Sequence, residues 1–157
     1  MTLPKSTQRI VDYAADRGVE VLIESFQEGT KTAADAAAAV GCEVAAIVKS
    51  LVFMVDEVAV LALIPGDLRL DEKELAQVVG GKRARRASLD EVREATGYVA
   101  GGTPPFAHDR PIQVLADRQL RRNEFLWTAG GTPSSVFRLS LDDLIRLSGA
   151  TWADVSR

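Results

Sequence analysis

The chain has almost no cysteine or histidine, with one residue of each among 157. A single cysteine cannot form an internal disulfide, which fits a reducing compartment, and it excludes a cysteine-based metal cluster. No apolar run approaches the roughly 18 residues that a membrane-spanning helix needs. The N-terminal stretch MTLPKSTQRI lacks the apolar segment of a signal peptide. These absences predict a cytoplasmic protein without a structural zinc site.

Several catalytic and cofactor-binding motifs are also missing. The sequence contains no G-x-S-x-G nucleophile turn, no P-loop and no dinucleotide fingerprint. The formal net charge of −3 and the pI near 5.2 argue against a dedicated duplex-DNA binder. Positive charge is nevertheless concentrated in GKRARR at 81–86 and DRQLRR at 117–122. These stretches are either solvated faces or a basic rim that contacts a phosphate backbone.

What is present fits one domain over residues 1–157, large enough to bury a single core. Apolar periodicity and capping residues predict helices at 7–18, 32–41, 72–79, 89–96 and 141–149, with a helical turn at 43–47. Strands are expected at 19–26, 48–55, 58–65, 82–87, 112–117, 124–129 and 136–140, and a tail at 151–157. Asp56 and Glu57 predict a tight hairpin, and the apolar run 58–65 predicts a strand covered on both faces. The irregular order indicates a mixed α/β fold, with a curled sheet flanked by helices.

Lys49 lies in an otherwise apolar strand, VKSLVFMV at 48–55. Strand alternation places Lys49, Leu51 and Phe53 on one face. Lys49 is therefore either an edge-strand lysine or an ammonium at the mouth of an apolar pocket, where it would attract a carbonyl oxygen or a phosphate.

The segment YVAGGTPPFAHDRP at 98–111 has neither helical nor strand periodicity. Gly101 and Gly102 allow close approach of a ligand to the main chain, and Pro104 and Pro105 make the segment stiff. It is either a rigid surface turn or the wall of a substrate pocket. His108 is interpreted as a structural hydrogen-bonding residue rather than a general base.

Taken in order along the chain, three segments resemble the YbaK and prolyl-tRNA-synthetase-associated editing-domain family, and its freestanding ProXp-type members in particular. TAADAAAAVGCEVAAIVKSLVF resembles the family's helix, turn and lysine-bearing strand. GYVAGGTPPFAH resembles its G-x-x-x-P loop, with Gly101 and Pro105 as the end residues, and WTAGGTPSSVFRLSLDDLIRLSG resembles its closing turn, strand and helix. The resemblance implies a barrel-like mixed sheet, no metal or organic cofactor, and hydrolysis of mischarged aminoacyl-tRNA.

The resemblance also implies a substrate and a site. The expected substrate is alanine or a similar small residue on tRNA(Pro); the alternatives are Cys-tRNA(Pro), or a non-catalytic module of the same fold that binds tRNA or a synthetase. Prolyl-tRNA synthetase is the expected protein partner, and neither a membrane nor DNA is. Several family members have histidine where this chain has Ser134, which leaves the amino-acid preference open. The expected site consists of the catalytic Lys49, a substrate-binding set of Leu51, Phe53, Gly101, Gly102, Thr103, Pro104, Pro105, Gly131 and Ser134, and a tRNA-binding set of Lys82, Arg83, Arg85 and Arg86.

Overall fold

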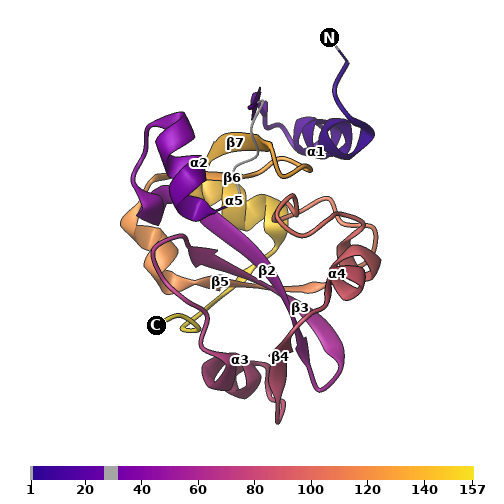
Figure 1. Cartoon of the computed structure of the whole chain (residues 1–157), viewed down its shortest axis with the longest axis vertical. Helices are drawn as coiled ribbons and strands as arrows, with labels where there is room; N and C mark the ends of the chain where they lie inside the picture. Colours follow the sequence, from indigo (N-terminus) through magenta and orange to yellow (C-terminus); the bar gives the residue numbers. More distant parts are fainter. Residues whose placement is uncertain (1, 27–31) are drawn as a thin grey trace.

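A computed structural model describes residues 2–26 and 32–157 (Figure 1). The helical elements are α1 (Lys5–Ala15), α2 (Ala33–Val40), η1 (Val44–Ala46), α3 (Glu72–Val79), α4 (Leu89–Thr96), η2 (Arg118–Arg122) and α5 (Leu141–Ser148). The strands are β1 (Ile23–Ser25), β2 (Val48–Val55), β3 (Val58–Pro65), β4 (Ala84–Arg86), β5 (Gln113–Asp117), β6 (Phe125–Ala129), β7 (Ser135–Ser140) and β8 (Thr151–Ala153). No helix in these described ranges is long and apolar enough to cross a membrane.

The strands form two sheets. The larger sheet has the order β4-β2-β3-β5-β8, in which β3–β5 and β5–β8 are parallel and the other pairs antiparallel. The smaller sheet has the antiparallel order β1-β7-β6. A single parallel bridge between Ile47 and Trp127 connects them. The prediction of a mixed α/β fold is confirmed, whereas the barrel-like sheet is wrong, because the two sheets remain open and do not close on each other.

Most element boundaries follow local signals in the sequence. Thr32 and Ser88 begin α2 and α4 with reciprocal capping boxes, and Asp71 caps α3 through its carboxylate. The β2–β3 hairpin turns at Asp56 and Glu57, whose φ angles of 48° and 69° are those of a tight turn that suits the twist of the strands.

Both faces of the larger sheet are buried, as the apolar run 58–65 predicts. Leu61 and Leu63 of β3 belong to a core cluster shared with α1, α4, α5 and the smaller sheet. Val60 and Ile64 point to the opposite face and pack in a second cluster with Leu75 of α3. Figure 1 shows α1 near β7 at one end of the molecule and α3 near β4 at the other. The loops that surround the candidate functional site lie between these two ends of the molecule.

Several segments differ from their predicted extent: α1 spans Lys5–Ala15 rather than 7–18, β1 is Ile23–Ser25 rather than 19–26, and η2 at Arg118–Arg122 was not predicted. The strand expected at 82–87 is shorter, because the main-chain N–H groups of Lys82 and Arg83 donate to the Asp56 carboxylate, at 2.9 and 3.0 Å, rather than to a neighbouring strand. The expected tail contains β8, which pairs with β5. Asp117 anchors it by accepting hydrogen bonds from the N–H groups of Val155 and Ser156 and from the Ser156 hydroxyl.

Candidate functional site

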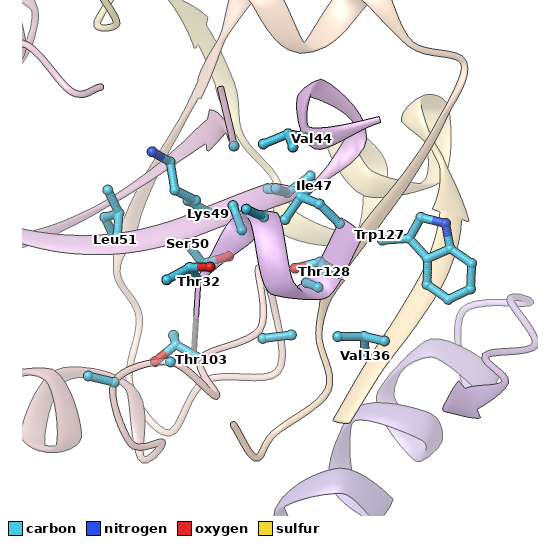
Figure 2. A pocket seen from close by; sticks show the side chains of 18 of the residues that line it. Thr32, Val44, Ile47, Lys49, Ser50, Leu51, Thr103, Trp127, Thr128 and Val136 are labelled. Carbon is cyan, nitrogen blue, oxygen red and sulfur yellow. The ribbon is translucent and has the colours of Figure 1, made fainter. Parts of the chain in front are cut away.

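A pocket of about 710 Å³ lies where the two sheets meet. Its walls are β2, the start of α2 with η1, the loop at 100–103, β6 and the beginning of β7 (Figure 2). The lining combines apolar side chains, among them Ile47, Leu51 and Val136, with a row of hydroxyl groups. A deep pocket of this size with a few polar groups is typical of a small-molecule or substrate site.

Lys49 lies on β2 at the rim of this pocket and is half-buried. Its Nζ donates a hydrogen bond to the carbonyl oxygen of Leu68. Burial lowers the pKa of the Lys49 amine; Asp67 opposes this shift, while the positive charges of Arg69 and Arg86 add to it. Lys49 and Arg86 both line the pocket, and the positive charge of Arg69 also acts on Lys49, so this side of the pocket is suited to attract an anion.

The loop at 98–111 is held against the turn at 130–135. The N–H of Gly131 donates to the carbonyl oxygen of Gly102 at 3.0 Å. A Cβ added at Gly102 would lie 2.9 Å from main-chain atoms of Thr132, so only glycine allows the two segments to approach this closely. The chain thus brings together two similar sequences, AGGTPP at 100–105 and AGGTPS at 129–134. Together they form one corner of the pocket.

The same loop presents unoccupied main-chain donors. Gly101 and Thr103 both line the pocket, and Gly101 has a φ of 85°. Within residues 2–26 and 32–157 the N–H groups of Gly101 and Thr103 donate to no acceptor, although the Thr103 hydroxyl donates to Val99. Free main-chain N–H groups at a pocket are suited to stabilise a developing oxyanion.

Helix α1 supports this corner from outside the pocket. The Thr7 hydroxyl is fully buried and donates to the carbonyl oxygen of Gly130 at 2.8 Å. Gly131 lies so close to α1 that an added Cβ would be 2.9 Å from the main chain of Ser6. The position of the turn therefore depends on the N-terminal helix.

Two hydroxyl groups in the pocket were not singled out from the sequence. Ser50 of β2 and Thr128 of β6 line the pocket, and their side-chain oxygens are buried without a hydrogen-bond partner among the described residues. Figure 2 shows the Ser50 side chain on the opposite side of β2 from that of Lys49, as strand alternation requires. Ser50 could have been identified from the sequence as a lone serine within an apolar strand.

Some of the predicted substrate-binding residues line the pocket and others do not. Leu51, Gly101 and Thr103 line the pocket together with Lys49. Gly102, Pro104, Pro105, Gly131 and Ser134 belong to the supporting loops and do not line it. Phe53 requires a correction, because its side chain is buried in the cluster against α3, farther along the same face of β2 as Lys49 and Leu51, and does not line the pocket. Substrate contact by the lining residues stays a prediction.

The four residues of the predicted basic rim also differ in their positions relative to the pocket. Arg86 lines the pocket. Arg85 instead forms ion pairs with Glu57 and Glu91, at 2.7 and 2.8 Å. Lys82 and Arg83 are exposed next to the β2–β3 turn, and they line a separate shallow surface depression rather than the pocket. Arg86 is therefore the member of this set that the structure brings to the pocket.

His108 has the structural position expected from the sequence. Its Nε2 lies 2.8 Å from the carbonyl oxygen of Pro104, and burial lowers the pKa of the imidazole. The ring is therefore neutral near pH 7 and stabilises the proline-rich loop. In the described part of the chain no group of three or more His, Cys, Asp or Glu side chains is placed to hold a metal ion.

The sequence model of the aminoacyl-tRNA editing domain matches residues 27–147. The chain therefore belongs to the aminoacyl-tRNA editing domain family, which confirms the resemblance identified from its motifs. A protein of Bacillus subtilis without an assigned function, YwhH, is 31% identical over 137 residues, which cover 86% of this chain and 87% of YwhH. The multifunctional Ser/Thr-tRNA deacylase ProXp-y of Escherichia coli is 38% identical over 91 residues, which cover 57% of this chain and 54% of that protein.

A solved structure of a candidate trans-editing enzyme for prolyl-tRNA synthetase is similar over its whole length. It superimposes with a TM-score of 0.92 at 39% identity, and the match covers 99% of both chains. The prediction of an aminoacyl-tRNA hydrolase agrees with the deacylase and editing activities for which these relatives are named.

Proposed function

We propose that this chain, acting as one editing domain, hydrolyses the ester that joins a small, wrongly attached amino acid to the 3′ end of tRNA(Pro). The observation that carries the proposal is that the family match at 27–147 includes every residue lining the pocket. The amino acid predicted from the resemblance is alanine or a residue of similar size. The relative named for prolyl-tRNA synthetase supports both tRNA(Pro) and that synthetase as partners.

The chemistry assigned to the pocket is attack of water on the ester carbonyl carbon. The carbonyl oxygen becomes an oxyanion that accepts hydrogen bonds from the free N–H groups of Gly101 and Thr103. One such donor contributes about 3 kcal/mol to transition-state stabilisation. The intermediate then breaks its bond to the ribose oxygen, which takes a proton, and the products are the free amino acid and tRNA. The neighbouring ribose hydroxyl can accept the proton that water loses, because no carboxylate or imidazole lines the pocket among the described residues.

Lys49 is assigned to the terminal phosphate of the tRNA rather than to the reacting carbonyl. Its amine donates to the carbonyl oxygen of Leu68, and its pKa is lowered first by burial and further by the positive charges of Arg69 and Arg86, against the opposing effect of Asp67. Neither arginine side chain forms an ion pair within the described residues, which leaves both available for phosphate oxygens.

A separate site for a small amino acid is needed because binding alone discriminates weakly. One methylene group changes the binding free energy by only about 1–3 kcal/mol, so a synthetase for a small apolar residue also accepts smaller ones. A second pocket, in the editing domain, can admit the smaller, wrongly attached amino acid and exclude the larger correct one by its size. Here the hydrogen bond between the 98–111 loop and the 130–135 turn fixes one wall, which favours such exclusion.

The test is a deacylation panel in which tRNA(Pro) is charged with alanine, serine, cysteine or proline. We expect loss of the ester from at least one small noncognate residue, with prolyl-tRNA(Pro) left intact. Tight binding of tRNA without hydrolysis of any ester would contradict the proposal and indicate a non-catalytic binding module. Hydrolysis of prolyl-tRNA(Pro) at the same rate as the others would contradict an editing role.

A further inference from the structure

The hydroxyl groups of Ser50 and Thr128 differ from the other buried hydroxyls of the molecule. Thr128 is 1% exposed, and neither its Oγ1 nor the Oγ of Ser50 has a hydrogen-bond partner among the described residues. By contrast, the hydroxyls of the buried Thr7 and Thr96 donate to carbonyl oxygens at 2.8 and 2.7 Å. The two unpartnered hydroxyls therefore both lie in the pocket between the two sheets.

An unpaired buried hydroxyl is unfavourable, and replacing it by an apolar group of the same shape is close to neutral for stability. A valine at 128 and an alanine at 50 would therefore serve the fold at least as well. Both strands that carry these residues are otherwise mostly apolar, with the sequences VKSLVFMV and FLWTA. The stability of the fold therefore does not explain why Ser50 and Thr128 are polar, whereas a molecule that binds in the pocket would explain it.

The chemistry of the pair defines what the occupant must offer. Each hydroxyl can donate one hydrogen bond and accept others. Rotation about χ1 among its staggered states directs each oxygen toward the pocket while the strands stay in place. A side chain with its own hydroxyl can accept from one group and donate to the other. The side chains of alanine and proline carry only carbon-bound hydrogen atoms, so they offer neither hydroxyl a hydrogen bond.

We propose that Ser50 and Thr128 make the pocket selective for an aminoacyl ester whose side chain bears a hydroxyl, with serine as the best substrate. The inference rests on the proposed function and narrows its small amino acid to a hydroxyl-bearing one. A site that hydrogen-bonds a substrate hydroxyl discriminates strongly against the analogue that lacks it. The pair also gives a chemical reason, in addition to size, for leaving the prolyl ester intact.

The experiment compares Thr128→Val and Ser50→Ala with the unchanged protein on tRNA(Pro) charged with serine or with alanine. We expect either substitution to lower kcat/KM for the seryl ester about 10-fold or more and to leave the alanyl ester within about twofold. The thermal midpoint of Thr128→Val should be unchanged or higher. The control is Thr96→Val, the same chemical change at a buried, paired hydroxyl of α4 that does not line the pocket, which should lower the midpoint and keep the serine-to-alanine ratio.

Two results would overturn the inference while leaving the proposed function intact. An unchanged serine-to-alanine ratio in both variants would show that the hydroxyls do not select the side chain. An equal loss on both esters would assign the hydroxyls to a group that the two substrates share, such as the α-ammonium.

A binding measurement separates this inference from hydrolysis itself. Amide-linked 3′-seryl and 3′-alanyl adenosine cannot be deacylated by the proposed reaction, and their affinities are measured by titration. We expect the seryl analogue to bind about 10-fold more tightly to the unchanged protein, with the difference removed by Thr128→Val. Equal affinities would refute the role of the pair, whether or not any charged tRNA is hydrolysed.

Discussion

Replacing Gly102 with alanine tests whether the contact between the two glycine-rich segments maintains the site. The added Cβ would lie 2.9 Å from the C and Cα atoms and 3.0 Å from the N atom of Thr132. All three are main-chain atoms, which cannot rotate away as a flexible side chain does. The segments must therefore separate, which strains or breaks the hydrogen bond from the N–H of Gly131 to the carbonyl oxygen of Gly102.

The expected magnitude follows from overpacking of a close contact, which typically costs about 1–3 kcal/mol. In a domain of about 150 residues each kcal/mol lowers the thermal midpoint by about 2–4 °C. Deacylation should fall further than stability, because the displaced segment carries the N–H groups of Gly101 and Thr103. A loss of one oxyanion donor corresponds to a rate reduction of about 10²-fold or more.

The assay measures the thermal midpoint and the single-turnover deacylation rate of Gly102→Ala at a temperature where the protein stays folded. The matched control is Gly80→Ala, at the end of α3, where φ is +81° and an added Cβ meets nothing within 4 Å. This control should lose some stability through its left-handed backbone but keep its deacylation rate. A Gly102→Ala protein with unchanged midpoint and unchanged rate would refute the reasoning about this corner of the pocket.

Four further outcomes are expected. Lys49→Met should weaken deacylation at subsaturating tRNA by about 10-fold or more, measured as kcat/KM, because the substitution removes the cation that we assign to the terminal phosphate; an unchanged value would contradict this assignment. Arg86→Gln should reduce tRNA affinity and lessen the dependence of log Kd on log salt concentration, whereas Lys82→Gln, at the exposed turn, should change both less; equal effects would contradict the placement of tRNA at the pocket. Glu91 has its pKa lowered to about 2, first by its hydrogen bond with an arginine side chain. Its stabilising effect is therefore present above the unfolded-state pKa near 4.5 and is lost as the pH falls toward 2, so the thermal midpoint of the unchanged protein should drop more between pH 6 and pH 2 than that of Glu91→Gln; parallel curves would contradict this. Asp117→Ala should lower the free energy of unfolding by about 2–4 kcal/mol and accelerate hydrogen exchange in β8, because four donors lose their acceptor, three of them in the segment at and after Val155 and one at Gln119; normal protection of β8 would contradict the anchoring role.

Local signals were sufficient for most of the fold. Capping residues and glycine stops placed α2 to α5, whereas α1 begins after Pro4 rather than after Ser6. Two neighbouring acidic residues, Asp56 and Glu57, placed the hairpin correctly despite the absence of glycine. Non-local effects were not predictable in the same way. β8 exists because a distant strand pairs with it and the Asp117 carboxylate holds the chain beyond it. The joining of the sheets through one bridge, rather than closure into a barrel, is likewise set by packing between segments far apart in sequence.

The candidate site shows the same division. The sequence predicted Lys49 and Leu51 from a lysine in an apolar strand, and the 98–111 loop from its stiff glycine-proline composition. All of these contribute to the pocket. Ser50 and Thr128 were missed because strand alternation places Ser50 on the side expected to be core. That side becomes part of a pocket because β6 faces it without filling the space, and this depends on the arrangement of the two sheets.

The support of the 130–135 turn by α1 has a consequence for how this protein can be shortened. A protein trimmed to the segment common to the family, 27–147, would retain every side chain that lines the pocket and would lose the helix behind it. The turn would then have open space where Ser6 and Thr7 now lie, and its partner loop would lose a fixed neighbour. The N-terminal helix thus supports a candidate site whose pocket it does not line, so substitutions outside the common segment are expected to change the shape of the pocket.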